Sequence, residues 1–432
     1  KHAIHLVGGT DLFQQSEFNA QMTMMKNTLE RDLFAGKVIT VKRESDDPIA
    51  PNQLQRITDR IQEGTSIMTY YGHYGIGDNG FEINLDDVSN WGNTGKYPLM
   101  IVNSCFNGDI FKPGLTSSSE YFVNAQNVGA IGYLSSTSTG FHPAVGTYSN
   151  RLYLQFSKYG YSQTIGEQMI TAINATYSPY YLFTEVTATQ MLLNGDPMLR
   201  INWHPKPEIE LLPENIRLSP NTIDLSVDSL ELQIVVKNLG QSITDTLIVE
   251  IRRNFPGSDT DSVYFLKRPR LDYTDTIRHK MPLQPSISAG LNSFEIRVDV
   301  PSMYPEMYDE LNNNQVIRQF MINLNGILPV APYEFAVIPW DTVTLVASTI
   351  NPLAEFNSYK FEIDTTDTFN SPFKKTALVS GLGGVKTVGM HQWNQSFTFT
   401  DSTVYFWRVA LDSDTAQWAE SSFQYIQGKK GW

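Results

Sequence analysis

The sequence predicts a multidomain fold, with an α/β domain built on a mostly parallel sheet followed by two all-β sandwiches. At 432 residues the chain is too long for a single hydrophobic core. Up to about residue 205, apolar strands alternate with one-faced helices, which is typical of a parallel sheet. After Pro205-Lys206-Pro207, helical periodicity gives way to period-two alternation. We therefore expect domains at residues 1–205, 206–326 and 327–432.

Short apolar runs in the first domain are expected to form its strands, at residues 4–7, 37–41, 66–71, 98–104 and 127–134. The first helix is indicated by apolar residues at steps of three and four, with Gly36 as its expected C-terminal cap, namely Phe18, Met22, Met25, Leu29 and Leu33. Further helices are expected around Leu54, Ile57 and Ile61, and at 144–158, 162–175 and 183–193. Such an alternation predicts a sheet covered by helices on both faces.

The other two domains show the alternation of half-buried antiparallel strands. In the second domain the expected inward residues are Leu230, Leu232, Ile234 and Val236, then Leu247, Val249 and Ile251, then Phe294, Ile296, Val298 and Val300. Glu295, Arg297 and Asp299 are the outward residues of the last strand. A break near Asn325-Gly326 opens the third domain, where Trp407 and Trp418 are the expected core aromatics. Strands at this spacing favour β-sandwiches.

Composition narrows the class of partners. The net charge is −13 and the pI is near 5.0, which disfavours nucleic acid and anionic membrane surfaces. The sequence has no apolar run of about 20 residues, so no membrane-spanning helix is expected. Its single cysteine forbids an intrachain disulfide but does not decide the compartment. Because the chain opens directly on an apolar strand, we interpret it as an excised piece of a longer polypeptide.

Two short segments carry the candidate chemistry, each directly after an apolar strand: Tyr71-Gly72-His73 and Asn103-Ser104-Cys105. Ligands of open parallel sheets bind at the carboxyl ends of strands, and strands consecutive in sequence usually lie about 4.8 Å apart. An imidazole and a thiol at these two ends can therefore meet. A thiolate is a strong nucleophile, and a nearby histidine can take and return its proton. Cys105 and His73 are thus the candidate nucleophile and base.

Backbone and pocket residues are expected around this pair. Gly72 and Gly108 would let the backbone approach a bound peptide, and amides near Ser104, Cys105 and Tyr74 are the candidate oxyanion donors. Ser135, Ser136 and Thr137, with Ser138 and His142 nearby, follow the next strand and are candidates to line the pocket for the residue before the cut. No acidic residue stands among them, so nothing there indicates selectivity for Arg or Lys.

Simpler interpretations compete with this one. A lone cysteine is more often a small buried apolar residue, although the polar neighbours Asn103, Ser104 and Asn107 argue against that here. An oxygen-rich stretch after His73 makes calcium the one candidate cofactor, through Asp78, Asn79, Glu82, Asn84, Asp86 and Asp87. Its spacing fits no EF-hand loop, so a solvated acidic loop is the favoured interpretation. No other cofactor is expected, and the remaining histidines show no metal-ligand spacing.

The motifs around this pair resemble the gingipain-type cysteine peptidases. The resemblance rests on Gly72-His73, on Trp91, and on the run from Ser104 to Phe111. It continues through Val128-Gly129-Ala130-Ile131-Gly132 and Leu193-Asn194-Gly195-Asp196-Pro197, in the family's order. It covers about residues 4–203 and implies a caspase-like fold, with Cys105 as nucleophile and His73 as general base and acid.

The family includes secreted gingipains and the surface sortase-like peptidase of the type IX secretion system of Bacteroidetes. The resemblance therefore implies a secreted or cell-surface endopeptidase or transpeptidase that acts on protein substrates. Residues 208–323 are similar to cell-adhesion-related Ig-like domains, at Asn238-Leu239-Gly240 and Glu310 to Asn314. Residues 330–427 resemble a fibronectin type III domain, most closely at Tyr405 to Val409. Both imply cell-surface or secretion-system partners.

The sequence also departs from the family pattern. Tyr74 follows the histidine where relatives usually carry glycine, and Gly75 comes one residue later. No acidic partner for His73 stands out; the candidates Glu44, Asp46 and Asp47 are each better interpreted as solvated loop charges. The family's N-terminal subdomain is missing from this sequence. The missing subdomain is consistent with excision, whereas Tyr74 and the unidentified acidic partner favour a rival hypothesis, an inactive caspase-like scaffold in a surface adhesin or secretion-machinery protein.

Overall fold

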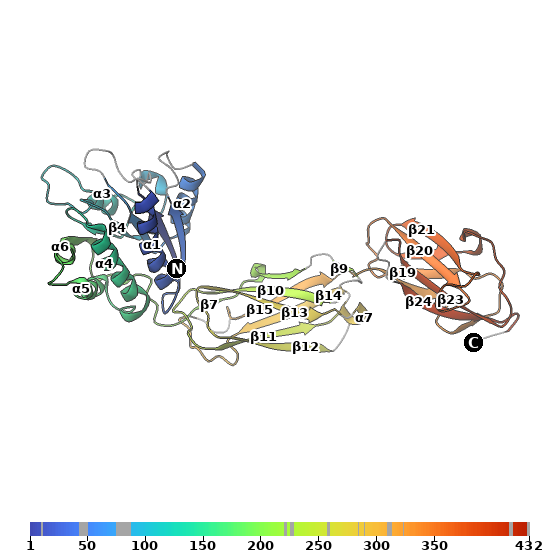
Figure 1. The fold of residues 1–432 in the computed structure, drawn as a ribbon. Helices are drawn as coiled ribbons and strands as arrows, with labels where there is room; N and C mark the ends of the chain where they lie inside the picture. The colour runs from blue at the N-terminus through green and yellow to red at the C-terminus, as the bar shows by residue number, and fades with distance from the viewer. Residues whose placement is uncertain are drawn as a thin grey trace.

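The computed structural model has an α/β domain and two β domains arranged in a row (Figure 1). It describes residues 1–9, 12–42, 51–74, 88–219, 223–224, 229–256, 260–283, 285–288, 290–308, 313–322, 324–413 and 418–429. None of the helices within these ranges is both long and apolar enough to cross a membrane.

A six-stranded sheet forms the centre of the α/β domain. Its strands are β1 (His2–Val7), β2 (Lys37–Lys42), β3 (Ile67–Tyr71), β4 (Leu99–Asn103), β5 (Gly132–Ser136) and β6 (Met191–Gly195). Their order is β2-β1-β3-β4-β5-β6, parallel except for β6, which runs antiparallel to β5. The predicted, mostly parallel sheet is therefore confirmed.

Helices cover both faces of this sheet, as predicted. One face packs against α1 (Leu12–Leu29), α4 (His142–Leu154) and α5 (Ile165–Thr176), and the other against α2 (Pro51–Glu63), η1 (Val88–Trp91) and α3 (Ser118–Asn124). Successive strand residues alternate between the two cores: Ile67 and Tyr71 face α1, whereas Met68 and Tyr70 face α2. Every residue of β3 and β4 is buried, because both faces of the sheet are covered.

The structure corrects two sequence-based boundaries late in this domain. The strand predicted at 127–134 begins only at Gly132, because Asn127 and Gly129 adopt positive φ and extend the preceding loop. The helix predicted at 183–193 ends early: α6 (Leu182–Gln190) gives way directly to β6. In the same region, α4 continues into a π-helical turn, η2 (Gln155–Tyr159).

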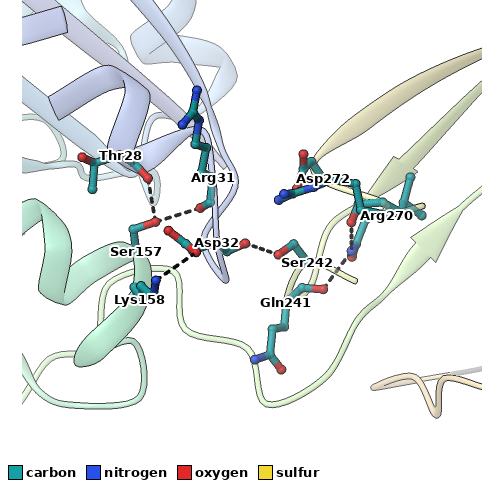
Figure 2. Close-up of polar contacts among 11 residues, drawn as sticks. Thr28, Arg31, Asp32, Ser157, Lys158, Gln241, Ser242, Arg270 and Asp272 are labelled. Atoms are coloured by element: carbon teal, nitrogen blue, oxygen red, sulfur yellow. Dashed lines mark hydrogen bonds and ion pairs between the residues drawn. The ribbon is translucent and has the colours of Figure 1, made fainter. Parts of the chain in front are cut away.

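The first helix also ends earlier than predicted. α1 stops at Leu29, and Gly36 is not its cap, because left-handed Asp32 and Ala35 have already turned the chain. The hydroxyl of Ser157 in η2 donates to the carbonyls of Thr28 (2.7 Å) and Arg31 (2.8 Å), as Figure 2 shows. These bonds satisfy carbonyls that the end of a helix leaves without partners.

The second domain is joined to the first at this same turn. The Ser242 hydroxyl donates to the Asp32 carbonyl, and the Ser242 amide donates to the Leu33 carbonyl at 3.1 Å. Figure 2 shows Ser242 pointing at the turn, beside the 3.9 Å ion pair between Lys158 and Asp32. The end of α1 is therefore a hydrogen-bonded contact between the α/β domain and the domain that follows.

The second domain packs two antiparallel sheets around one core. One sheet holds β7 (Ile209–Glu210), β8 (Ile216–Ser219), β10 (Ser229–Asn238) and β13 (Thr274–Pro282). The other holds β11 (Leu247–Asn254), β12 (Asp261–Arg268), β14 (Gly290–Val298) and β15 (Gln315–Ile322). The domain also has a separate two-stranded pair, β9 (Ile223–Asp224) with β16 (Leu324–Asn325), and two short helices, η3 (Pro213–Asn215) and α7 (Pro285–Ser288). The alternation predicted for β10, β11 and β14 is confirmed, except that Val300 lies beyond the end of β14 and is only half-buried.

One predicted outward residue of this domain is buried. Asp299 is only 3% exposed and has a φ of 62°. Its carboxylate accepts the amides of Met303 (3.1 Å) and Tyr304 (2.9 Å), so it holds the loop after β14 instead of continuing the strand.

The third domain has a second pair of packed sheets. These are β17 (Ile327–Ala331), β19 (Leu345–Thr349) and β22 (Val385–Val388), opposite β18 (Ala336–Ile338), β24 (Ala419–Tyr425), β23 (Thr403–Leu411), β20 (Asn357–Asp364) and β21 (Lys375–Gly381), with η4 (Met390–Gln392) nearby. Trp407 is fully buried in this core, as predicted. The prediction for Trp418 is wrong: it is half-buried and covers the guanidinium of Arg408, 4.2 Å from its ring centroid.

A buried histidine makes the stability of the first domain depend on pH. His5 of β1 is fully buried, and its Nε2 lies 2.9 Å from the hydroxyl of Tyr153, which in turn lies 2.6 Å from Thr69 Oγ1. Burial lowers the pKa of His5 to about 3. The unfolded chain takes up this proton near pH 6.5, so the folded state excludes a proton that the unfolded state binds.

We expect acid to destabilise the α/β domain through His5. The contribution of His5 to the free energy of unfolding is fully present above about pH 6.5. It is lost as the pH falls toward 3, by about 1.4 kcal/mol per pH unit. The free energy of unfolding, measured by denaturant titration from pH 4 to 8, should fall less steeply with acid in His5→Gln. Identical slopes for the variant and the parent would contradict the assignment.

Candidate active site

The two candidate catalytic residues lie at adjacent strand ends. In the parallel register of β3 and β4, Tyr71 pairs with Asn103, and the amide of Gly72 still donates to the Asn103 carbonyl at 3.3 Å. His73 and Cys105 therefore each stand two residues beyond the paired positions, at the same edge of the sheet. Both are half-buried. The adjacency of these strands, which the sequence predicted, is confirmed.

The ring of His73 is held from the first turn of α1. Its Nε2 lies 3.0 Å from Oε1 of Gln14, and the edge of Phe18 contacts it with ring centroids 5.9 Å apart. Gly9 allows the chain to turn sharply from β1 into this helix: its φ is +125°, and a Cβ there would lie 2.8 Å from Gln15 Cγ. The contact to an uncharged amide fixes the ring orientation without placing a carboxylate on that nitrogen.

Sequence reasoning missed Gln14. The signal available was its position four residues before Phe18, which places both on the same helix face, turned toward the sheet. The acidic candidates for this role, Glu44, Asp46 and Asp47, lie outside the described residues, as do Gly75 and the predicted calcium ligands from Asp78 to Asp87. Within the described residues, no group of three or more His, Cys, Asp or Glu side chains could hold a metal ion.

Cys105 lies on a tight, firmly held turn. Phe106, directly after it, has a φ of 57°, a left-handed conformation that costs a non-glycine residue energy and occurs often at functional sites. The buried side chain of Asn107 donates to the Cys105 carbonyl at 3.2 Å and accepts from the Tyr133 hydroxyl at 3.0 Å. The Phe106 amide donates to the Ser138 carbonyl at 2.9 Å. These bonds fix the direction of the thiol.

Both reactive side chains face the side of the sheet that α1 and α4 cover. The Cys105 thiol points to the carbonyl of Gly140, 3.8 Å away, just before α4 begins. The N-terminal ends of α1 and α4 meet where His142 Nε2 lies 3.3 Å from Glu17 Oε2. Helix N-termini favour negative charge, the charge that a thiolate and a tetrahedral oxyanion carry. The arrangement is therefore suited to anionic nucleophilic chemistry.

The residues predicted to form the oxyanion hole differ in whether their backbone amides are already engaged in hydrogen bonds. Among the described residues, the Cys105 amide has no hydrogen-bond acceptor, so it is available to an oxyanion, whereas the Gly72 amide is committed to Asn103. Ser104 is buried, and a Cβ at Gly140 would lie 2.9 Å from the Ser104 carbonyl oxygen. Gly108 approaches Ser135 Oγ in β5, where a Cβ would lie 2.7 Å away, so its close contact is within the protein. The oxyanion roles stay predictions.

Tyr74 does not lie on the same side as His73. Its ring packs against the core shared by α2 and α3, and its hydroxyl accepts a hydrogen bond from Ser118 at 2.8 Å. Alternation along the extended chain thus directs His73 toward α1 and Tyr74 toward α3.

Of the predicted pocket residues, Thr137 and His142 are half-buried and Ser138 is exposed, whereas Ser135 and Ser136 do not reach the surface. Ser135 and Ser136 are fully buried in β5, and the Ser136 hydroxyl donates to the Ser138 carbonyl at 2.9 Å. Their side chains therefore do not line an open pocket, a correction that follows from β5 extending to Ser136. Thr137 is half-buried, and its amide donates to the Gln190 carbonyl at 3.0 Å.

A thiol and an imidazole at adjacent carboxyl ends of a parallel sheet are typical of α/β cysteine peptidases. Residues 1–202 match the model of Peptidase family C25. The match supports a cysteine peptidase of the gingipain type.

Solved structures resemble the chain only weakly. One is the complex of the pro- and mature domains of RgpB from Porphyromonas gingivalis, with 14% identity over 74% of this chain and 68% of that chain and a TM-score of 0.38. Another is a structure of a protease, with 13% identity over 74% of this chain and 67% of that chain and a TM-score of 0.37. No curated protein matches the chain.

We expect Gln14→Ala to slow the chemistry of Cys105 by about tenfold, because a free imidazole loses its productive orientation. The measurement is the rate of Cys105 alkylation by a peptidyl thiol reagent at fixed pH. Gln21→Ala is the matched control: it lies on the same helix but contacts Asn150, at 2.6 Å, instead of His73. Equal rates in the two variants would mean that Gln14 has no positioning role.

Proposed function

We propose that the first domain is a cysteine endopeptidase, or a transpeptidase, that works through an acyl-enzyme on Cys105. The observation that carries this proposal is the pairing of β3 with β4, which brings His73 and Cys105 to one edge on the side of α1 and α4. The match of residues 1–202 to Peptidase family C25 supports it independently.

The proposed reaction follows from these positions. His73 takes the proton of the Cys105 thiol, and the thiolate attacks the carbonyl carbon of the scissile peptide bond. The Cys105 amide donates to the resulting oxyanion, with a second donor expected near Tyr74. The C–N bond then breaks as His73 returns the proton to the leaving amine. Water, or the amine of a second peptide, then attacks the thioester carbonyl and gives its proton to His73. The C–S bond breaks, the acyl group is released, and the Cys105 thiolate leaves and regains a proton from His73.

The setting of this activity is also part of the proposal. By resemblance, the protein is secreted or lies at the cell surface in association with the outer membrane, linked to the type IX secretion system of Bacteroidetes. The second domain would be Ig-like and the third fibronectin type III-like. The sandwich cores of both domains support their proposed role as spacers that present the peptidase, its substrate or a surface partner.

The rival proposal is an inactive scaffold in a surface adhesin or secretion-machinery protein. It drew support from Tyr74 and from the sequence not identifying an acidic partner for His73. The packing of Tyr74 on the α3 side and the contact of Gln14 with the His73 ring weaken both grounds. We therefore favour the peptidase.

Thiol labelling tests the peptidase proposal. A peptidyl chloromethyl ketone or acyloxymethyl ketone should label Cys105 in the folded parent. In His73→Ala the labelling rate should be at least about a hundredfold lower, because the variant loses the general base. Mass spectrometry of the intact chain measures the label, and Cys105→Ala is the blank. Absence of labelling in folded protein, or a rate unchanged by His73→Ala, would favour the scaffold.

A second measurement asks whether Tyr74 obstructs the site. Because its ring packs on the opposite side, we expect Tyr74→Gly to lower stability by about 3–5 kcal/mol while changing the labelling rate less than threefold. Ser118→Ala removes only the hydrogen bond to the Tyr74 hydroxyl and provides a milder control. A labelling rate that rises tenfold or more in Tyr74→Gly would show that Tyr74 blocks access.

A further inference from the structure

Large apolar side chains are exposed beside the candidate active site. Before and within the start of α6, Tyr180 is 96% exposed, Leu182 66% and Phe183 41%. Single exposed apolar residues are ordinary on protein surfaces, but a contiguous group indicates a binding surface. Tyr181 belongs to the same segment and is also exposed.

A continuous series of ring contacts connects this segment to His73. The centroids of His73 and Phe18 are 5.9 Å apart, those of Phe18 and His142 5.6 Å, and those of His142 and Phe141 5.9 Å. Phe141 then stacks on Phe183 at 3.7 Å, and Phe183 contacts Tyr181 at 5.6 Å. We call this series the aromatic ladder. Its outer end, at Phe183 and Tyr181, is exposed, whereas its inner end holds the proposed base.

The ladder also adjoins the nucleophile. The Cys105 thiol faces the carbonyl of Gly140, and Phe141 is the next residue. A Cβ at Gly140 would lie 2.9 Å from the Ser104 carbonyl oxygen, so glycine keeps this segment close against the Cys105 turn. Phe141, whose half-buried ring belongs to the ladder, is therefore one residue away from the carbonyl that the thiol faces.

Within the described residues, the carboxylates beside the ladder do not favour a basic side chain. Glu17 lies 3.3 Å from Nε2 of His142. On the other side of Cys105, Asp109 is paired with Lys112 at 3.3 Å. Glu185, in the first turn of α6, is exposed to solvent, where its attraction for a cation is screened.

We propose that the outer part of the ladder, together with the neighbouring Leu182, binds an aromatic or large aliphatic side chain next to the scissile bond of an extended peptide. The outer part consists of Phe141, Phe183 and Tyr181. The cleavage itself rests on the proposed peptidase function. The ladder would make the enzyme selective for apolar residues, because removing aromatic and apolar surfaces from water by packing them together is favourable. Because the ladder is continuous with the site of Cys105 and His73, we assign this surface to substrate binding.

Two readouts test the proposal separately from catalysis. The first is kcat/KM for matched peptides that carry Phe, Leu, Arg or Asp at each position flanking the cut, for which we expect the Phe and Leu peptides to exceed the others by at least about tenfold. The second is direct binding of the same peptides to Cys105→Ala by fluorescence anisotropy, with the same ranking. Binding does not need the chemistry, so it remains decisive if no peptide is cleaved.

The variants separate the ladder from other surfaces. Tyr181→Ser combined with Leu182→Ser alters only exposed side chains, and Phe183→Ser also removes the stack on Phe141; each should lower the preference for Phe at least fivefold. Tyr333→Ser, a residue 78% exposed in the third domain, should leave it unchanged, as should Glu185→Gln. A preference for Arg, or one that these ladder variants do not alter, overturns the proposal.

Failure of the peptidase function would look different. Absence of both cleavage and Cys105 labelling, together with ladder-dependent binding of apolar peptides to Cys105→Ala, would refute the activity and keep the binding surface. Self-association measured by light scattering, if the ladder variants abolish it and no peptide preference is found, would assign the surface to a second copy of this chain and overturn the proposal.

Discussion

The packing of α1 on the sheet, beside α4, is the constraint on which the candidate site depends. The buried face of this helix, with Phe18, Met22 and Met25, fixes its height over β1 and β3. That placement brings Gln14 to the ring of His73 at one end and the turn at Asp32 to Ser242 at the other. Core packing, which is the largest contribution to stability, therefore also sets the positions of the polar groups on which the proposed chemistry depends.

Much of the site could be predicted because its residues follow strands with strong local signals. The uniformly apolar runs before His73 and Cys105 indicate buried parallel strands, and parallel strands end at one edge. Gln14 could not be predicted in the same way, since a neutral amide in the first turn of a helix carries no charge pattern. Its role depends on how α1 lies over β3, a contact between residues 59 positions apart.

The wrong sequence-based predictions have a common cause: the local pattern of apolar and polar residues does not show which other parts of the chain pack against a segment. Leu192 and Leu193 extend an apolar helical pattern, yet they form β6, because β5 presents an edge with which they pair. Trp418 has the composition of a core residue but covers Arg408 at the surface, where the guanidinium also forms a 2.6 Å ion pair with Glu362. Asp299 alternates as an outward residue, but two loop amides make its burial favourable.

The contact between Ser242 and the end of α1 has a mechanical consequence. An 18-residue helix is about 27 Å long and stiff along its axis. Besides the peptide chain itself, hydrogen bonds from Ser242 to the carbonyls of Asp32 and Leu33 connect the second domain to one end of this rod. The other end carries Gln14, whose amide contacts the ring of His73. A movement of the second domain that shifts α1 along its axis would therefore also move Gln14 relative to His73.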